Sequence, residues 1–278
     1  VSPTPTGRLV FVSNRDGNNE IYRMNADGSG VQRLTSDGAD DRDPSWDPTG
    51  TYVAFASNRS GNFEIWVLDT GTLGAVPITN DAASDYQPSW SPDGNYIAFV
   101  SERNLGGSTD PEVWRVPVSG PVVLGPPQAL TNNAIDDLNP AWRPDSARIA
   151  YQSGGAGSYD IWLMDGDGAN QTSLVTTGGD DIEPAWSNDG NTIVFATNRH
   201  GNFELYTIPA GGGTQVRRTN TGGIDHRSPD WSADGAYLYH HQESGGLIDV
   251  YRMWSTGQNP TALTSNGAVV DRDPDWLP

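Results

Sequence analysis

A proline followed two residues later by a tryptophan recurs six times along the chain of 278 residues. The tryptophans are Trp46, Trp90, Trp142, Trp186, Trp231 and Trp276, and they are separated by 44, 52, 44, 45 and 45 residues. A repeat of this period indicates stacked structural units, because one such unit cannot bury its hydrophobic face alone. The sequence therefore predicts a single array of six similar units.

Each unit contains four short segments that are rich in aromatic and β-branched residues, which are typical of strands. In one copy these segments are Pro88–Trp90, Tyr96–Ser101, Glu112–Val116 and Gln128–Thr131. Asp-Gly pairs such as Asp93-Gly94 supply the positive φ angles that tight hairpins need. Four strands in each unit of about 44 residues predict an all-β fold, a six-bladed β-propeller with four antiparallel strands per blade.

The two ends of the chain each hold part of one unit. Residues 8–35 contain three strand segments without a Pro-x-Trp strand before them, and the segment that ends at Trp276 has no strand after it. We therefore expect the C-terminal strand to complete the first blade, which closes the ring and removes its edges. The propeller is expected to span residues 8–278, and residues 1–7, rich in Pro and Thr, are expected to be a linker.

Charge and composition limit the classes of partner. The formal net charge is −19, all 16 basic residues are arginine, and there is no cysteine. The acidic charge argues against binding to nucleic acid or to an anionic membrane surface. The absence of cysteine excludes disulfides and thiolate metal sites, and no apolar run reaches the roughly 20 residues of a membrane helix. We expect a monomer that binds a protein, a peptide or a divalent cation and does not insert into membranes.

The repeated motif resembles the TolB-type propeller repeat. It occurs in this chain as Pro-Ser-Trp-Ser-Pro-Asp-Gly at residues 88–94, with further parts at Ser57–Trp66 and Ser13–Met24. The resemblance covers essentially the whole chain from Gly7. It implies a non-enzymatic binding scaffold for a protein or peptide, in the periplasm or outside a bacterial cell.

A recurring acid is the first candidate site. It stands three residues before the proline in five copies and four residues before it in the sixth: Asp41, Asp85, Asp137, Asp181, Asp271 and Asp225. Carboxylates suit Ca²⁺, which takes six to eight oxygen ligands, so these residues could hold a Ca²⁺ ion at the mouth of the channel. The alternative is local: each acid forms a turn and pairs with an arginine of its own blade. More acids stand nearby, at Asp40, Asp43, Asp136, Asp180, Glu183 and Asp273.

Places where the repeat is broken are the second candidate. Arginine recurs after the second strand, at Arg15, Arg59, Arg103 and Arg199, where it should brace the blade. The arginine is lost at Ser153–Ser158 and at Gln242–Leu247, and one copy has an insertion at Asn104–Pro111. A ligand contact could lie on this irregular side.

An enzyme is the competing hypothesis. A polysaccharide lyase could use a metal held by His226 with His240 or His241, and a glycosidase could use a pair of channel carboxylates. The chain contains no Ser-His-Asp order, no His-Glu-x-x-His and no phosphate loop. The enzyme hypothesis predicts that histidines or paired carboxylates converge outside the repeat symmetry.

Overall fold

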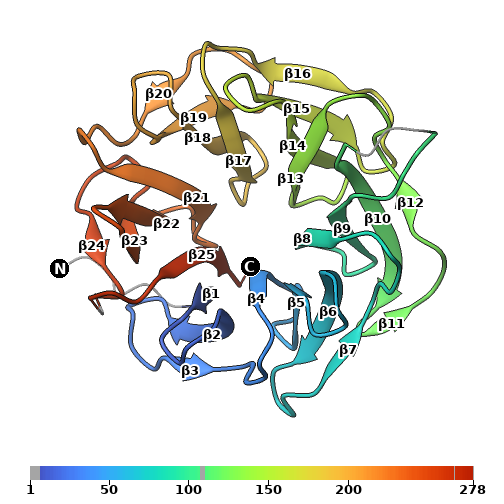
Figure 1. Cartoon of the computed structure of the whole chain (residues 1–278). Helices are drawn as coiled ribbons and strands as arrows, with labels where there is room; N and C mark the ends of the chain where they lie inside the picture. Colours follow the sequence, from blue (N-terminus) through green and yellow to red (C-terminus); the bar gives the residue numbers. More distant parts are fainter. Residues whose placement is uncertain (1–6, 107–109, 266, 278) are drawn as a thin grey trace.

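The predicted repeat folds as six antiparallel sheets around a central axis (Figure 1). The computed structural model describes residues 7–106, 110–265 and 267–277. No helix occurs among these residues, so none of them forms a helix able to span a membrane. The prediction of a six-bladed all-β propeller is confirmed.

The strands of each blade follow one another from the axis outwards. The first blade contains β25 (Asp271–Trp276), β1 (Arg8–Ser13), β2 (Glu20–Asn25) and β3 (Gln32–Arg33). The second contains β4 (Asp41–Trp46), β5 (Tyr52–Ser57), β6 (Glu64–Asp69) and β7 (Ala75–Pro77). The third contains β8 (Asp85–Trp90), β9 (Tyr96–Ser101), β10 (Glu112–Ser119), β11 (Val122–Val123) and β12 (Gln128–Ala129).

The other three blades have four strands each. The fourth contains β13 (Asp136–Trp142), β14 (Arg148–Gly154), β15 (Asp160–Asp165) and β16 (Thr172–Val175). The fifth contains β17 (Asp181–Trp186), β18 (Thr192–Thr197), β19 (Glu204–Pro209) and β20 (Val216–Arg217). The sixth contains β21 (Asp225–Trp231), β22 (Tyr237–Ser244), β23 (Leu247–Trp254) and β24 (Thr261–Ala262). The additional strand β11 of the third blade lies in the longer of the units and pairs with the end of β10.

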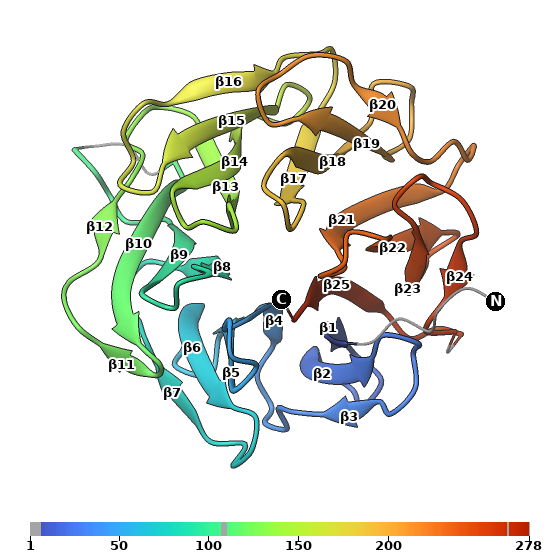
Figure 2. The same ribbon diagram turned by 180° about the vertical axis from the view of Figure 1, so that it is seen from behind.

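The ring closes as the sequence predicts. Strand β25 pairs with β1, with Trp276 opposite Leu9 and Asp271 opposite Ser13, so the C-terminal strand is the innermost strand of the first blade (Figure 2). Trp276 is buried and stacks on Tyr239 of the sixth blade, with ring centroids 4.8 Å apart. Hydrogen bonds and packing therefore join the last residues to two different blades. Residues 1–6 of the predicted linker lie outside the described residues.

The inner strands share a bulge at the residue before each proline. The pairing of each inner strand with its neighbour shifts register at this point, for example between Arg42 and Ser45. The six residues before proline have φ angles of 48–55°, a region that non-glycine residues rarely adopt. Proline has no N–H to donate, so it suits a strand whose inner edge has no partner strand. The bulge re-aims the preceding side chain, and in all six blades that side chain lines the central cavity.

Candidate functional site

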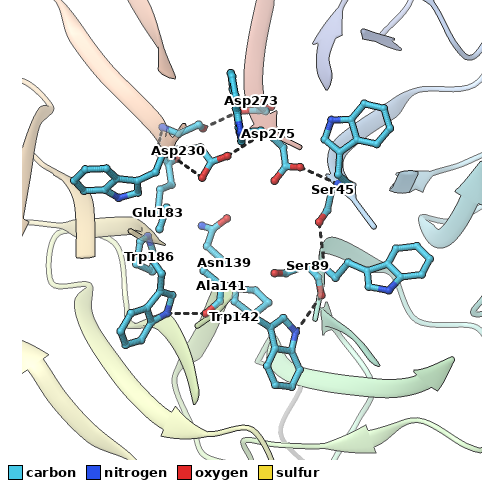
Figure 3. Close-up of a pocket in the computed structure, with 18 of the residues that line it drawn as sticks. Ser45, Ser89, Asn139, Ala141, Trp142, Glu183, Trp186, Asp230, Asp273 and Asp275 are labelled. Atoms are coloured by element: carbon cyan, nitrogen blue, oxygen red, sulfur yellow. Dashed lines mark hydrogen bonds between the residues drawn. The ribbon is translucent and has the colours of Figure 1, made fainter. Parts of the chain in front are cut away.

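The central cavity encloses about 380 Å³ and is lined by all six inner strands (Figure 3). The residues directly before the six prolines form a ring around the cavity on the side of the channel mouth, which we call the upper ring. Its members are Asp43, Gln87, Asn139, Glu183, Ser228 and Asp273. Several of these side chains bond to the next blade. The Asn139 N–H donates to Gln87 Oε1 (3.0 Å), and the Ser228 N–H donates to Glu183 Oε2 (2.7 Å). The residues of this ring therefore join neighbouring blades by hydrogen bonds as well as lining the channel.

A second ring lies one step further along the strands, at the residues before the tryptophans: Ser45, Ser89, Ala141, Ala185, Asp230 and Asp275. These side chains also bond across blades. The Trp276 N–H donates to Asp230 Oδ2 (2.6 Å), the Trp46 N–H to Asp275 Oδ2 (2.8 Å), and the Trp90 N–H to Ser45 Oγ (3.1 Å). Serine and aspartate thus perform the same structural task, but only aspartate adds a charge.

The acids of both rings gather on neighbouring blades, and the pKa values of Asp43, Asp230 and Asp275 are raised. Burial raises the pKa of Asp230 to about 7, and burial together with the charge of Asp230 raises the pKa of Asp275 well above its usual value. In the upper ring, burial and the nearby charge of Asp273 raise the pKa of Asp43 to about 6. Desolvation and like charge both disfavour ionised carboxylates. One half of the channel is therefore acidic, and the half that carries Gln87 and Asn139 is neutral.

The mouth above the upper ring is a second cavity of about 470 Å³. Arg42, Arg227 and Arg272 line it from β4, β21 and β25, three consecutive inner strands. The Nε atom of each is buried and makes no hydrogen bond in the described part of the chain. Arg272 Nε forms an ion pair with Asp273 Oδ2 (3.5 Å), and Arg227 Nη2 donates to Glu183 Oε1 (2.9 Å). The Arg42 guanidinium lies 3.5 Å from the centroid of the Phe63 ring, and Tyr86 extends the aromatic side of the mouth. The mouth therefore offers guanidinium donors and aromatic faces above an acidic channel.

Four of the predicted metal ligands pair with arginines of their own blades. Each of these carboxylates is fully buried. The pairs are Arg59–Asp41 (2.7 Å), Arg103–Asp85 (2.6 Å), Arg199–Asp181 (2.8 Å) and Arg15–Asp271 (3.0 Å). The local alternative describes this geometry, since the arginine supplies the positive charge.

Asp137 and Asp225 have other partners. Asp137 is buried and accepts a hydrogen bond from Asn133 Nδ2 (2.7 Å). Asp225 accepts the Phe203 N–H (2.8 Å), and His226 takes the place in the strand that aspartate holds in other blades. Of the described residues, these six aspartates are not among those that line the channel cavities. A cation bound by them stays a prediction.

Comparison with known proteins identifies the family. The model of the TolB beta propeller domain matches residues 2–105, 42–125 and 125–278. The chain belongs to the TolB beta propeller domain family. A TolB homolog from Chlorobaculum tepidum is 47% identical over 47 residues, which are 17% of this chain and 11% of that relative. The Tol-Pal system protein TolB from Geobacter sulfurreducens is 47% identical over 45 residues, 16% of this chain and 10% of its own length. The matches thus span about a tenth of these curated relatives.

A solved structure confirms the fold over the whole propeller. TolB from Acinetobacter baumannii superposes with a TM-score of 0.83 at 22% identity, covering 99% of this chain and 68% of that one. At this identity the similarity establishes the fold alone, because one fold can serve many functions.

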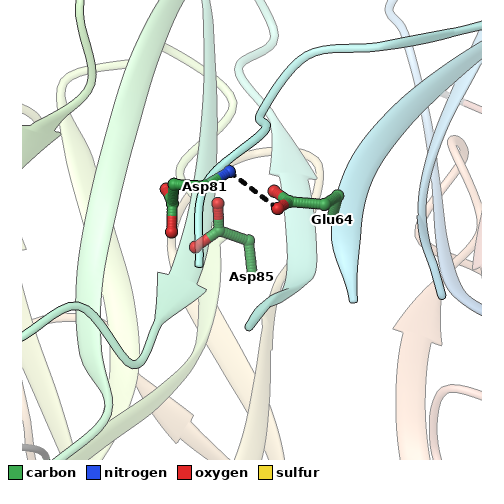
Figure 4. Close-up of side chains that lie close together, drawn as sticks. All are labelled: Glu64, Asp81 and Asp85. Carbon is green, nitrogen blue, oxygen red and sulfur yellow. Dashed lines mark hydrogen bonds between the residues drawn. The ribbon is translucent and has the colours of Figure 1, made fainter. Parts of the chain in front are cut away.

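One acidic group of this TolB-type propeller has the spacing of a metal site. Ligand oxygens of Glu64, Asp81 and Asp85 lie within 4.8 Å of one another (Figure 4). Arg103 contacts both Asp81 and Asp85, and the Asp81 N–H donates to Glu64 Oε1 (2.8 Å). A cation here would have to compete with a guanidinium that already neutralises the acids.

The histidines of the enzyme hypothesis divide between two surroundings. His226 and His240, on the neighbouring strands β21 and β22, pack against each other with ring centroids 5.1 Å apart, and burial lowers the pKa of both. His241, the next residue along β22, lines the mouth, and its Nδ1 lies 3.7 Å from Asp273 Oδ1. Successive residues of a strand point to opposite faces. The three imidazoles therefore do not form a common cluster in the channel.

From the sequence, Asp43, Glu183 and Asp273 are expected only as additional acids, and nothing marks Asp230, Asp275 or the three arginines of the mouth as site residues. Their positions in the repeat could have indicated them. The residues directly before the recurring proline and tryptophan vary in type between copies, and these are the two positions of the motif that face the channel. The insertion Asn104–Pro111 includes residues 107–109, which lie outside the described residues.

Proposed function

We propose that this TolB-type propeller is a non-enzymatic binding module that holds a protein or peptide at the channel mouth. The observation that carries the proposal is the group of three arginines, Arg42, Arg227 and Arg272, each with a buried Nε that makes no hydrogen bond within the described residues. Buried donors without acceptors cost free energy. Backbone carbonyls or carboxylates of a bound segment would satisfy them, and Tyr86 and Phe63 would contact its apolar parts.

The order of charges along the channel, arginines at the mouth and carboxylates deeper inside, indicates which groups a bound peptide segment would carry. Below the arginines lie Asp43, Glu183 and Asp273, and deeper still Asp230 and Asp275. A segment that enters the channel would meet positive charge first and negative charge second. We expect an acidic group at the mouth, followed by a lysine, an arginine or an N-terminal ammonium directed into the channel, because complementary charge sets register and specificity.

A selection experiment tests this function. Random peptides displayed on phage would be selected on the wild-type protein and then screened on a variant with Arg42→Gln, Arg227→Gln and Arg272→Gln. Peptides that bind the mouth should lose at least tenfold in affinity on this variant. Arg23→Gln, at a partly exposed arginine of β2 that does not line the channel cavities, is the control and should leave binding unchanged. Peptides that bind all three proteins equally would contradict the assignment of the mouth.

We also propose that Ca²⁺ can bind in the channel. Asp43 and Asp273 face the cavity from adjacent blades. Burial and, after it, the charge of Asp273 raise the pKa of Asp43, and a divalent cation would relieve the repulsion between the two carboxylates. A ligand that binds only the folded state raises its stability. The melting temperature should therefore rise with millimolar Ca²⁺ and fall back with chelator, and Asp43→Asn with Asp273→Asn should remove the response. An unchanged melting temperature would remove the ion from the proposal.

Cellular location and oligomeric state are part of the same proposal. The Geobacter relative is named for the Tol-Pal system, which supports a place in the bacterial envelope, in the periplasm or outside the cell. A monomer is expected, and light scattering across a range of protein concentrations would test it.

A further inference from the structure

Arg42 differs from the other two arginines of the mouth because no carboxylate pairs with its guanidinium. Arg227 Nη2 donates to Glu183 Oε1 (2.9 Å), and Arg272 Nε lies 3.5 Å from Asp273 Oδ2. The side chain of Arg42 makes neither a hydrogen bond nor an ion pair with any of the described residues. Its full capacity to donate hydrogen bonds is therefore left for a bound molecule.

Arginines elsewhere in the described part of the chain show how unusual this is. Arg59 bonds to Asp41 (2.7 Å), for example, and Arg115 Nη1 donates to the carbonyl oxygen of Gly166 (2.6 Å). An arginine carries five N–H donors, and donors that lose water without gaining an acceptor cost free energy. Among the described residues, Arg42 is the one partly buried arginine whose side chain has no hydrogen-bond or ion-pair partner.

A comparison of two identical tripeptides gives the physical reason. The sequence Asp-Arg-Asp precedes the proline in the first and second blades, at residues 271–273 and 41–43. In the second blade the Arg42 guanidinium stacks on Phe63, with its carbon 3.5 Å from the ring centroid, a favourable cation–π contact. The first blade has Asn19 at the matching position before the third strand. The aromatic ring therefore holds the guanidinium away from the neighbouring aspartate.

The guanidinium of Arg42 can be reached from the mouth. Arg42 lines the cavity of about 470 Å³ and is partly exposed. Its Nε atom is buried, whereas its two Nη atoms, which make no hydrogen bond in the described part of the chain, are not buried. Because Phe63 covers one face of the planar group, a ligand would meet the edge formed by Nη1 and Nη2.

The charges around this edge select the class of ligand. Glu102 and Glu243 line the same cavity, together with Asp43 and Asp273. These acids would repel a dianionic phosphate more strongly than a group with a single negative charge. A carboxylate has one charge, and its two oxygens match two parallel N–H groups of a guanidinium. A carboxylate therefore fits this edge better than a phosphate.

We propose that Arg42 is the residue that recognises a carboxylate of the bound segment, through hydrogen bonds from Nη1 and Nη2. The inference rests on the proposed function and deepens it, since it assigns the recognition of the acidic group to one of the three arginines. The other two stay paired with acids of the upper ring. Phe63 acts as a positioning residue, because it keeps the guanidinium turned to the mouth.

Single variants test this assignment by calorimetry, with the tightest mouth-binding peptide from the phage selection as the probe. Arg42→Gln should lower the affinity at least about tenfold, whereas Arg272→Gln, the matched control in the identical tripeptide, should lower it less than about threefold. Equal losses in the two variants would overturn the inference and leave the mouth as the binding site. No loss in either variant would contradict the proposed function as well.

A double-mutant cycle between protein and peptide tests the pairing itself. Changing the acidic residue of the peptide to its amide should weaken binding to the wild type at least about tenfold, but binding to Arg42→Gln less than about twofold. An equal loss on both proteins would show that the carboxylate binds elsewhere, and would overturn the inference. Arg42→Lys keeps the charge without the paired N–H groups and serves the same cycle if Arg42→Gln does not fold.

The role of Phe63 is tested by giving the second blade the residue of the first. Phe63→Asn should let Arg42 turn to Asp43 and lower the affinity for the acidic peptide at least about threefold, while the amide peptide should bind as it does to the wild type. Phe203→Asn, at the ring 4.7 Å from the guanidinium carbon of Arg227, is the control and should change neither affinity. Unchanged binding by Phe63→Asn would refute the positioning role.

Discussion

Replacing Asp230 by serine should stabilise the protein at neutral pH. Ser45 shows that a serine at this position of the inner strand can accept the backbone N–H of the next blade, so Asp230→Ser keeps the bond to Trp276 and removes the charge. Burial raises the pKa of Asp230 from 3.8 to about 7. A difference of about three pKa units corresponds to roughly 4 kcal/mol, which is an upper limit because channel water screens the charge.

The sign of the pH dependence follows from this raised pKa. Below about pH 4 the carboxyl is protonated in both states and costs nothing. Between about pH 4 and pH 7 the folded state retains a proton that the unfolded state has lost, so the free energy of unfolding falls as pH rises. Above pH 7 the carboxyl is ionised in both states, and the folded state bears the full free-energy cost of burying the charge. The variant also loses the hydrogen bond from the Trp231 N–H, worth about 1 kcal/mol. We expect a net gain of about 1–3 kcal/mol at pH 7.5 and a loss of up to about 1 kcal/mol at pH 4.

Urea unfolding in buffer with chelator, at pH 4, 5.5 and 7.5, measures this difference by linear extrapolation. Ser45→Asp is the matched control, because it adds a carboxylate to the same ring; it should destabilise the protein most at pH 7.5. If Asp230→Ser is less stable than the wild type at pH 7.5, or differs from it equally at every pH, the account of the channel carboxylates is wrong.

Two further predictions concern the closure of the ring. Trp276→Ala should lower the free energy of unfolding by about 3–5 kcal/mol, since this residue is 5% exposed and stacks on Tyr239. A loss no larger than that of Trp66→Ala, at a half-buried tryptophan of β6, would argue against a closing role. Arg15→Gln and Asp271→Asn, which break the ion pair between the two ends of the chain, should show a coupling of about 1–2 kcal/mol in a double-mutant cycle, and additive effects would contradict a direct interaction.

Fold and closure could be read from the sequence because they depend on period and local chemistry. The spacing of the Pro-x-Trp motifs fixed the number of blades, and the incomplete units at residues 8–35 and 271–276 required the two ends to pair. The pairing of arginine with aspartate was also foreseeable, since both residues belong to one blade and recur together.

The lining of the channel could not be predicted from the sequence in the same way, because it depends on contacts between blades. Whether Asp41 or Asp43 faces the channel is decided by the bulge before Pro44, which turns one side chain towards the axis and leaves the other inside the blade. The sequence pattern alone does not distinguish one acid from another. In the structure, Asp41 is paired with Arg59, whereas Asp230 and Asp275 lie in the channel wall. The sequence by itself determined the repeated unit and its closure. Only the tertiary structure decided which carboxylates share the channel.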